Sequence, residues 1–465
     1  MSPLELNSGD TAWILTSAAL VLLMTPGLAL FYGGMVRAKS VLNMMMMSFG
    51  ALGVVSLLWV VYGYSLSFGN DVGAGLLGNP GEFFGLKGLM IDDPEATYPV
   101  MAFVAFQAVF AIITVALISG AIADRAKYST WLIFVVIWVT VVYFPIAHWV
   151  FDFTLTDDNN VVTHAGGWIA NQLSAIDFAG GTAVHINAGA AGLALAIVLG
   201  KRIGFRREPM RPHNLPLVML GAGLLWFGWF GFNAGSALSA GNTASVVWVN
   251  TMVATAAASI GWLITERIRD GHPTSLGAAS GVVAGLVAIT PSCSSVSPIG
   301  AIFLGGLAGV FCALAVGLKY KFGYDDSLDV VGVHLIGGLW GTIAVGLFLS
   351  PDSPAGVSYE KSGVFYGGGV DQLWRQVVGA IAVMITSFVL TYLIGLLLHK
   401  TIGFRVAEED ELGGVDGSEH AESGYDLGTL GASLRGIGAG ASTPRRADSD
   451  ASDAPESHLD KEVSA

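Results

Sequence analysis

The chain of 465 residues is divided into long apolar runs that contain no Asp, Glu, Lys or Arg. Since one bilayer crossing needs roughly 20 mostly apolar residues, each run is a candidate membrane-spanning helix. Only 12% of the residues are charged, too few for a water-facing surface, which excludes soluble, disordered, collagenous and nucleic-acid-binding classes. We predict eleven crossings, at residues 12–34, 40–69, 97–123, 128–147, 178–200, 215–233, 244–265, 274–290, 297–318, 330–350 and 376–398. The run at 274–290 is short and glycine-rich, so we expect it to tilt or to enter the bilayer only in part.

The basic residues of the loops test this topology, because Lys and Arg concentrate on the cytoplasmic side of a membrane. One set of alternate loops carries fifteen Lys and Arg residues, and the opposite set carries three. This asymmetry predicts an odd number of crossings, with the N-terminus outside the cell and the C-terminus inside. The first residues contain acidic groups and no basic segment, so we expect the first run to remain a helix and not a cleaved signal peptide.

The composition changes after Arg405, where large apolar side chains become rare. Residues 406–465 hold 14 acidic and 4 basic groups, a net charge of -10 out of the total of -13. Such a segment cannot form a packed core alone. We therefore predict a transmembrane domain over residues 1–405 and an acidic, largely disordered cytoplasmic tail over residues 406–465. The tail either solubilises the protein or docks a cytosolic regulator.

Two histidines lie inside the predicted spans, where a buried ionisable group is costly and marks a functional site. His185 stands in VHINAGAAG and His334 in VHLIGGLWG, and both segments fit V-H-x-x-x-G-x-x-G. They occupy spans five and ten, so they run in opposite directions through the bilayer, as in inverted-repeat transporters. The predicted fold is an all-α membrane protein with an inverted repeat of five plus five helices and one extra helix.

Glycines follow each histidine at four and seven residues, on the same face of the helix, where they allow another helix to approach closely. A two-fold axis would place the rings of His185 and His334 side by side, sharing one proton between neutral imidazoles. The competing interpretation is two unrelated core histidines. Contact requires both helices to begin below the membrane surface, after polar breaks near Asp177 and Asp329. We expect Asp177 to be a structural helix cap, and its alternative role is that of a proton acceptor.

The spans offer no buried acid beyond Asp177 at the rim, so the species that passes the histidines is expected to be uncharged. An aromatic box outside would hold a cation through its ring faces. A substrate that exists both as a weakly acidic cation and as a small neutral base fits both parts. The spans contain no buried nucleophile, metal cluster or paired carboxylates, so we predict no enzyme, no metal and no cofactor. Cys293 and Cys312 show no metal-ligand or disulfide spacing.

Six segments, in order along the chain, carry a resemblance to a known family. They are GLALFYGGMVRAK at 27–39, AFQAVFAIITVALISGAIADR at 105–125, DFAGGTAVHINAGAAGL at 177–193, GWFGFNAGSA at 228–237, NTMVATAAA at 250–258 and DDSLDVVGVHLIGGLWG at 325–341. With them, residues 12–412 resemble the ammonium transporters of the Amt/Mep/Rh superfamily, specifically the microbial Amt branch.

The resemblance implies site residues. It gives twin pore histidines at His185 and His334, an external gate at Phe110 and Phe232, a vestibule serine at Ser236, a pore-lining tryptophan at Trp229, an external-mouth residue at Gln107 and an acid important for activity at Asp177. One position departs from the family pattern, since the vestibule tryptophan is expected at Phe151 and this chain has Trp149 two residues earlier. Phe is the weaker cation-π partner, so either the external cation site is weaker or Trp149 supplies the ring after a local shift.

The resemblance also implies a mechanism and partners. Ammonium would bind in an external vestibule, lose its proton near the gate and cross as ammonia between the histidines of a multi-pass cell-membrane protein. Such proteins are homotrimers, and a PII-type regulatory protein can block the microbial members from the cytoplasm. The segment GFRVAEEDELGGVD at the start of the tail resembles the regulatory C-terminus. The alternatives are an Rh-like neutral gas channel and an ammonium sensor that signals through a cytosolic partner.

Overall fold

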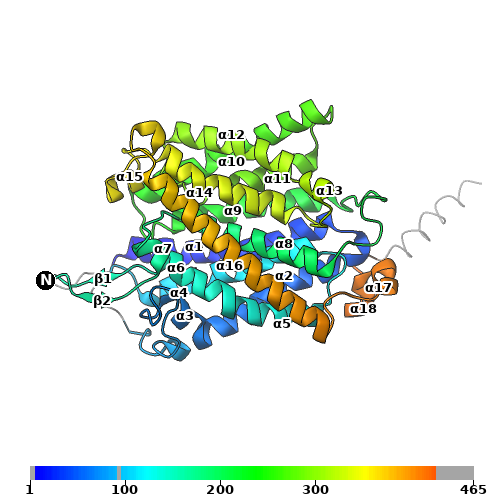
Figure 1. The fold of residues 1–465 in the computed structure, drawn as a ribbon, viewed down its shortest axis with the longest axis horizontal. Coiled ribbons are helices and arrows are strands. Elements are labelled where there is room, and N and C mark those ends of the chain that lie inside the picture. The colour runs from blue at the N-terminus through cyan, green and yellow to red at the C-terminus, as the bar shows by residue number, and fades with distance from the viewer. Residues whose placement is uncertain (1–5, 92–95, 426–465) are drawn as a thin grey trace, which may run out of the picture. The chain divides into compact units, whose positions relative to one another are not determined.

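Long helices account for the apolar runs of the sequence and lie alongside one another in a bundle (Figure 1). The computed structural model describes residues 6–91 and 96–425. Among these residues, ten helices are long and apolar enough to cross a membrane, and they coincide with ten of the eleven predicted runs. The remaining run forms a shorter apolar helix, α11 (Ser275–Ile289). Its 15 residues span about 22 Å, less than the roughly 30 Å hydrocarbon core of a bilayer.

Several spans consist of consecutive helical segments, in which η marks a 3-10 or π turn. The spans are α1 (Ser8–Met35); η1 (Ala38–Ser40), α2 (Val41–Leu58), η2 (Trp59–Gly63) and α3 (Tyr64–Phe68); α4 (Val100–Ile118) and η4 (Ser119–Ile122); α5 (Tyr128–Trp138), η5 (Val139–Tyr143) and α6 (Phe144–Phe151); η6 (Gly181–Ile186) and α8 (Asn187–Leu199); α9 (Leu215–Gly235); α10 (Asn242–Arg269); α12 (Pro298–Ala315) and α13 (Leu318–Phe322); η7 (Val331–Leu335) and α14 (Ile336–Phe348); and α16 (Asp371–Thr401). Outside them lie η3 (Phe84–Leu86), β1 (Leu155–Thr156), β2 (Val162–His164), α7 (Trp168–Asn171), α15 (Pro354–Tyr359), η8 (Val364–Tyr366), α17 (Glu408–Gly413) and α18 (Val415–His420).

Glycines allow these helices to pack closely. A Cβ atom on Gly221 of α9 would lie 2.3 Å from the backbone nitrogen of Phe31 in α1. A Cβ atom on Gly305 of α12 would lie 2.1 Å from the carbonyl oxygen of Ala254 in α10. Since lipid provides no hydrophobic force between helices, such close contact of backbones is a main source of their association.

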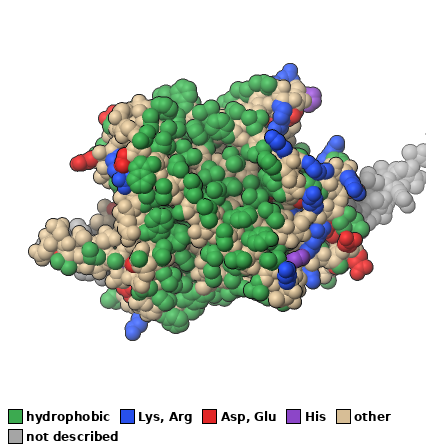
Figure 2. All heavy atoms as spheres, in the orientation of Figure 1, with side chains coloured by type: hydrophobic (Ala, Val, Ile, Leu, Met, Phe, Trp, Pro, Cys, Tyr) green, Lys and Arg blue, Asp and Glu red, His purple; other side chains and the backbone are tan. Residues whose placement is uncertain are grey.

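The two ends of the bundle differ in charge and in structure. Figure 2 shows an apolar band across the molecule and a concentration of Lys and Arg side chains at one end, the end where Figure 1 shows α17 and α18. The opposite end carries the antiparallel β1–β2 hairpin, α7 and α15 (Figure 1). The basic loops of the sequence are therefore gathered in space, as their alternation along the chain predicted.

The first part of the predicted tail is folded. Asp416 of α18 accepts hydrogen bonds from the backbone nitrogens of Leu42 and Asn43, at 3.0 and 2.8 Å, at the start of α2. Glu411 of α17 forms an ion pair of 2.7 Å with Arg405. The compact unit extends to Gly424, so it continues past the boundary predicted at residue 405. Residues 426–465 of the predicted tail lie outside the described residues.

Candidate functional site

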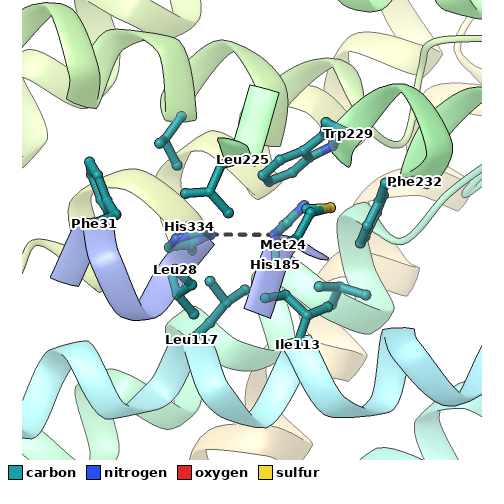
Figure 3. A pocket seen from close by; sticks show the side chains of 12 residues that line it. Met24, Leu28, Phe31, Ile113, Leu117, His185, Leu225, Trp229, Phe232 and His334 are labelled. Carbon is teal, nitrogen blue, oxygen red and sulfur yellow. Dashed lines mark hydrogen bonds between the residues drawn. The ribbon is translucent and has the colours of Figure 1, made fainter. Parts of the chain in front are cut away.

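The two histidines from spans five and ten are in contact inside the bundle (Figure 3). Their Nδ1 atoms are 3.4 Å apart, at the long end of the hydrogen-bond range, and the ring centroids are 5.4 Å apart. His185 is 1% exposed and His334 is 3% exposed. One N–H group of a neutral imidazole can thus donate to the free ring nitrogen of the other.

An aspartate eight residues before each histidine caps the helix that carries it. Asp177 accepts hydrogen bonds from the backbone nitrogens of Gly180, Gly181 and Thr182, at 2.9, 2.6 and 2.7 Å. Gly180 has φ +118°, a left-handed conformation that glycine adopts at little cost and that lets the chain turn into η6. The polar groups at this break are therefore satisfied inside the protein, as irregular backbone at membrane depth requires.

The second cap repeats this arrangement at η7. Asp326 accepts from the backbone nitrogens of Val330 and Val331, at 3.1 and 2.8 Å. Burial raises the pKa of Asp326 to about 6, although the charge of Lys319 opposes this rise. A polar break near Asp329 is predicted by the sequence analysis. The carboxylate of Asp329 instead forms an ion pair of 2.6 Å with Lys319, and Asp326 is the residue whose side chain caps the helix. Both histidines thus lie in the first turns of helices that begin inside the molecule.

Glycines bring the two helix starts together. A Cβ atom on Gly189, four residues after His185, would lie 2.4 Å from the backbone nitrogen of Leu335. A Cβ atom on Gly338, four residues after His334, would lie 3.1 Å from Cβ of His185. In the same reciprocal way, η6 packs on α14 and η7 packs on α8. The close approach predicted from the glycine spacing is present for this pair of positions.

Aromatic rings form a column that leads to His185. The rings of Phe110 and Phe232 are 4.2 Å apart with an interplanar angle of 33°, and both side chains are buried. Phe232 lies 6.0 Å from the imidazole of His185, with the two rings stacked. The indole of Trp229 also stacks on His185, at 5.3 Å (Figure 3).

The histidines line a very small cavity (Figure 3). Its volume is about 10 Å³, measured for the centre of a water-sized sphere, which is close to the minimum that holds one water molecule. Its other lining residues are apolar or aromatic: Met24, Leu28, Phe31, Ile113, Leu117, Val184, Leu225, Trp229, Phe232 and Val283. No lining residue is an Asp, Glu, Lys or Arg, so a cation in this cavity would meet no compensating charge.

A larger cavity of about 510 Å³ is lined by Phe110, whereas its stacking partner Phe232 lines the small cavity at the histidines. Gln107, Phe110, Phe151 and Ser236 are among the residues that line it. The hydroxyl of Ser236 donates to the carbonyl oxygen of Phe232 at 2.8 Å, which leaves its oxygen lone pairs free to accept. Three of the predicted vestibule residues, Gln107, Phe151 and Ser236, thus share one cavity.

Comparison with known proteins shows the family. The Ammonium Transporter Family model matches residues 12–425. An ammonium transporter of Mycobacterium tuberculosis is 60% identical over 446 residues, covering 92% of each chain. One of Corynebacterium glutamicum is 45% identical over 427 residues, covering 92% of this chain and 91% of its own. This chain belongs to the ammonium transporter family.

Solved structures agree with this assignment to the ammonium transporters. Mep2 of Saccharomyces cerevisiae is similar with a TM-score of 0.78 and 32% identity, covering 87% of this chain and 88% of that one. A structure described as a sensor Amt protein is similar with a TM-score of 0.79 and 30% identity, covering 89% and 98%. The apolar helices and the family together make this transporter a multi-pass protein of the cell membrane.

The vestibule of this transporter differs from one expectation. Trp149 does not line the 510 Å³ cavity, because its indole nitrogen donates to the carbonyl oxygen of Leu76 at 2.8 Å and its ring packs on Trp168 at 5.8 Å. These contacts do not support the alternative that Trp149 replaces the missing vestibule ring. Phe151 lines the cavity and lies edge-on to Phe110 at 6.5 Å.

Two polar features of the site are not predicted by the sequence analysis. The cap Asp326 is not named there, although Asp326 precedes His334 by eight residues, as Asp177 precedes His185. The indole nitrogen of Trp229 donates to the hydroxyl of Thr290 at 2.9 Å, after the end of α11. No local pattern could indicate this second contact, because it joins positions 61 residues apart.

Proposed function

We propose that this chain binds ammonium in the 510 Å³ outer cavity, removes its proton near Phe110 and Phe232, and conducts ammonia between His185 and His334. The released proton crosses separately along the two imidazoles, whose Nδ1 atoms are 3.4 Å apart, so that ammonia and proton together carry one charge across the membrane. The contact of two buried histidines in a narrow, otherwise apolar cavity carries this proposal. An ion entering this cavity would lose its hydration without gaining a charged partner, which costs several kcal/mol. Ammonia would lose only hydrogen bonds, which the ring nitrogens can replace.

The proposed topology has eleven crossings, with the hairpin end outside and the basic end inside. The short helix α11 is counted as a crossing in addition to the ten long spans. The turns between Ile289 and Pro298 extend it toward α12. The positive-inside rule supports this orientation, since the basic side chains gather at the end that holds α17 and α18. The reciprocal packing of η6 on α14 and η7 on α8 supports the inverted repeat of five plus five helices.

The proposal extends to domains and partners. Residues 1–405 form the transmembrane ammonium-channel domain, and residues 406–465 form a cytoplasmic tail whose first part, to Gly424, belongs to the same compact unit. The transporter assembles as a homotrimer, and a PII-type regulatory protein binds its cytoplasmic face, as the family resemblance implies. An ammonium sensor is the second candidate, supported by the similarity to the sensor Amt protein over 89% of this chain.

Liposomes that contain the purified transporter test the proposed conduction. We expect ammonium to induce a current and labelled methylammonium to accumulate, while potassium does not permeate. Substituting His185→Asp places a carboxylate in the apolar cavity and should admit potassium. The matched control is His272→Asp, an equal change in an exposed loop.

Three outcomes would contradict the proposal. Exclusion of potassium by His185→Asp would refute the uncharged pore. Uptake that ignores membrane potential would favour an Rh-like neutral gas channel. Absence of flux in the wild-type chain, combined with loss of a cellular nitrogen response on its deletion, would favour the sensor.

A further inference from the structure

A second group of titratable side chains lies at the outer cavity, apart from the paired histidines. Nε2 of His164, at the end of β2, is 2.9 Å from both carboxylate oxygens of Asp152. Asp152 directly follows α6, so this contact ties the hairpin to the end of a span. Asp152 and His164 both line the same 510 Å³ cavity as Phe110, Phe151 and Ser236.

Other charged groups face this pair from the neighbouring elements. Nδ1 of His148, a fully buried residue of α6, lies 3.2 Å from the Asp152 carboxylate, and its Nε2 lies 3.3 Å from Asp71. Glu82, whose carboxylate accepts from the backbone nitrogen of Asn70, also acts on His164 through its charge. The cluster thus contains three carboxylates and two histidines, and protonation of His164 removes one unit of its net negative charge.

The carboxylate of Asp152 keeps capacity to accept a further hydrogen bond. Its two oxygens offer about four acceptor positions, whereas among the described residues the side-chain nitrogens in contact with it are Nε2 of His164 and Nδ1 of His148, and the latter also lies 3.2 Å from the carbonyl oxygen of Ser67. Asp152 also follows Phe151, the ring that binds cations less strongly than the expected tryptophan. Among the described residues, no group of three or more His, Cys, Asp or Glu could hold a metal ion.

We propose that Asp152 is a cation-binding residue of the outer vestibule, and that protonation of His164 controls how strongly it attracts ammonium. With His164 neutral, the Asp152 carboxylate draws the cation to the cavity wall beside Phe151. With His164 protonated, the pair is neutral and the attraction weakens. This inference rests on the proposed function, because it assumes that ammonium enters through this cavity.

The surroundings of His164 shift its pKa upward. Its hydrogen bond to Asp152 raises the pKa of His164 above its ordinary value of about 6.5, burial opposes this rise, and the charges of Asp152 and Glu82 add to it. The pair therefore changes its charge at a pH above the one at which an ordinary histidine titrates. Methylammonium stays almost completely protonated at such a pH, so the concentration of the transported cation does not change.

The test is the pH dependence of KM for methylammonium uptake into liposomes, between about pH 5 and pH 8, the range in which histidine titrates. In the wild-type chain we expect KM to rise about three- to tenfold as pH falls, with the maximal rate less affected. His164→Gln should hold KM near its low, alkaline value throughout, since Asp152 keeps its charge. Asp152→Asn should raise KM at every pH and abolish its pH dependence.

Asp158→Asn is the matched control, because it removes the same charge from the exposed tip of the same hairpin and does not line the cavity. It should behave as the wild-type chain. A folding defect would lower the maximal rate and leave KM unchanged. The variant His164→Gln tests the contact between His164 and Asp152 without removing the carboxylate. If the wild-type chain transports but Asp152→Asn keeps its KM, or His164→Gln keeps the pH dependence, this inference is overturned. Failure of the wild-type chain to transport would instead overturn the proposed function.

Discussion

The contact between His185 and His334 depends on the absence of side chains beside them. At Gly189 a Cβ atom would lie 2.4 Å from the backbone nitrogen of Leu335, and a backbone atom cannot move aside as a flexible side chain does. The histidine pair is therefore held by two helix starts that pack through backbone atoms, not by the imidazoles alone.

Gly189→Ala should separate these helix starts. We expect it to lower the free energy of unfolding by about 1 to 3 kcal/mol, the usual cost of overpacking, and to reduce ammonium flux. Thermal unfolding in detergent measures the first effect and liposome uptake the second. Gly223→Ala is the control, since this glycine of α9 has open space around it and alanine favours a helix by up to about 1 kcal/mol. Equal effects of the two substitutions would contradict the packing argument.

At the scale of elements, the β1–β2 hairpin is short and exposed, and the Asp152–His164 contact attaches it to α6. The pKa of His164 is raised in the folded protein, so the pair contributes its full stability below the unfolded pKa. This contribution is lost as pH rises through the folded pKa. The hairpin should therefore loosen on the alkaline side, where the proposed cation attraction is strongest.

Hydrogen exchange measures this loosening. Protection of the amides in residues 155–164, corrected for the intrinsic effect of pH, should fall between slightly acidic and slightly alkaline solution. Protection in α8 should not change, and Asp152→Asn should leave the hairpin loose at every pH. Constant protection of the wild-type hairpin across this range would show that the ion pair does not hold it.

At the scale of the whole molecule, the tail divides into two parts with different roles. Its first part is joined to the basic end by Asp416 on the start of α2 and by Glu411, which pairs with Arg405 and accepts from the backbone nitrogen of Ile203 at 2.6 Å. Residues 426–465 lie outside the described residues and contain few large apolar side chains.

Two deletions distinguish these parts. Removing residues 406–465 should lower the unfolding temperature, because buried Glu411 and Asp416 no longer satisfy their backbone and arginine partners. Removing residues 426–465 should leave both the unfolding temperature and the flux unchanged. A comparable loss of stability in both variants would contradict the structural role assigned to residues 406–424.

The sequence by itself determined the helical spans and the histidine pair. A charge inside a bilayer is costly, so uncharged runs mark the spans, and a helix satisfies all the backbone hydrogen bonds of such a span within itself. A histidine within such a run is therefore conspicuous. The glycine spacing after His185 and His334 then indicated which faces meet, because a helix repeats regularly over seven residues.

Only the tertiary structure decided the vestibule. Trp149 and Phe151 stand at the last turn of α6, where periodicity no longer tells which ring faces the cavity. The contacts of His148 with Asp71, and of Asp416 with α2, join positions 77 and 374 residues apart. Local patterns indicate burial in the membrane, because each segment leaves water according to its own residues. The polar contacts at the two ends of the bundle instead depend on how distant segments of the chain fold together.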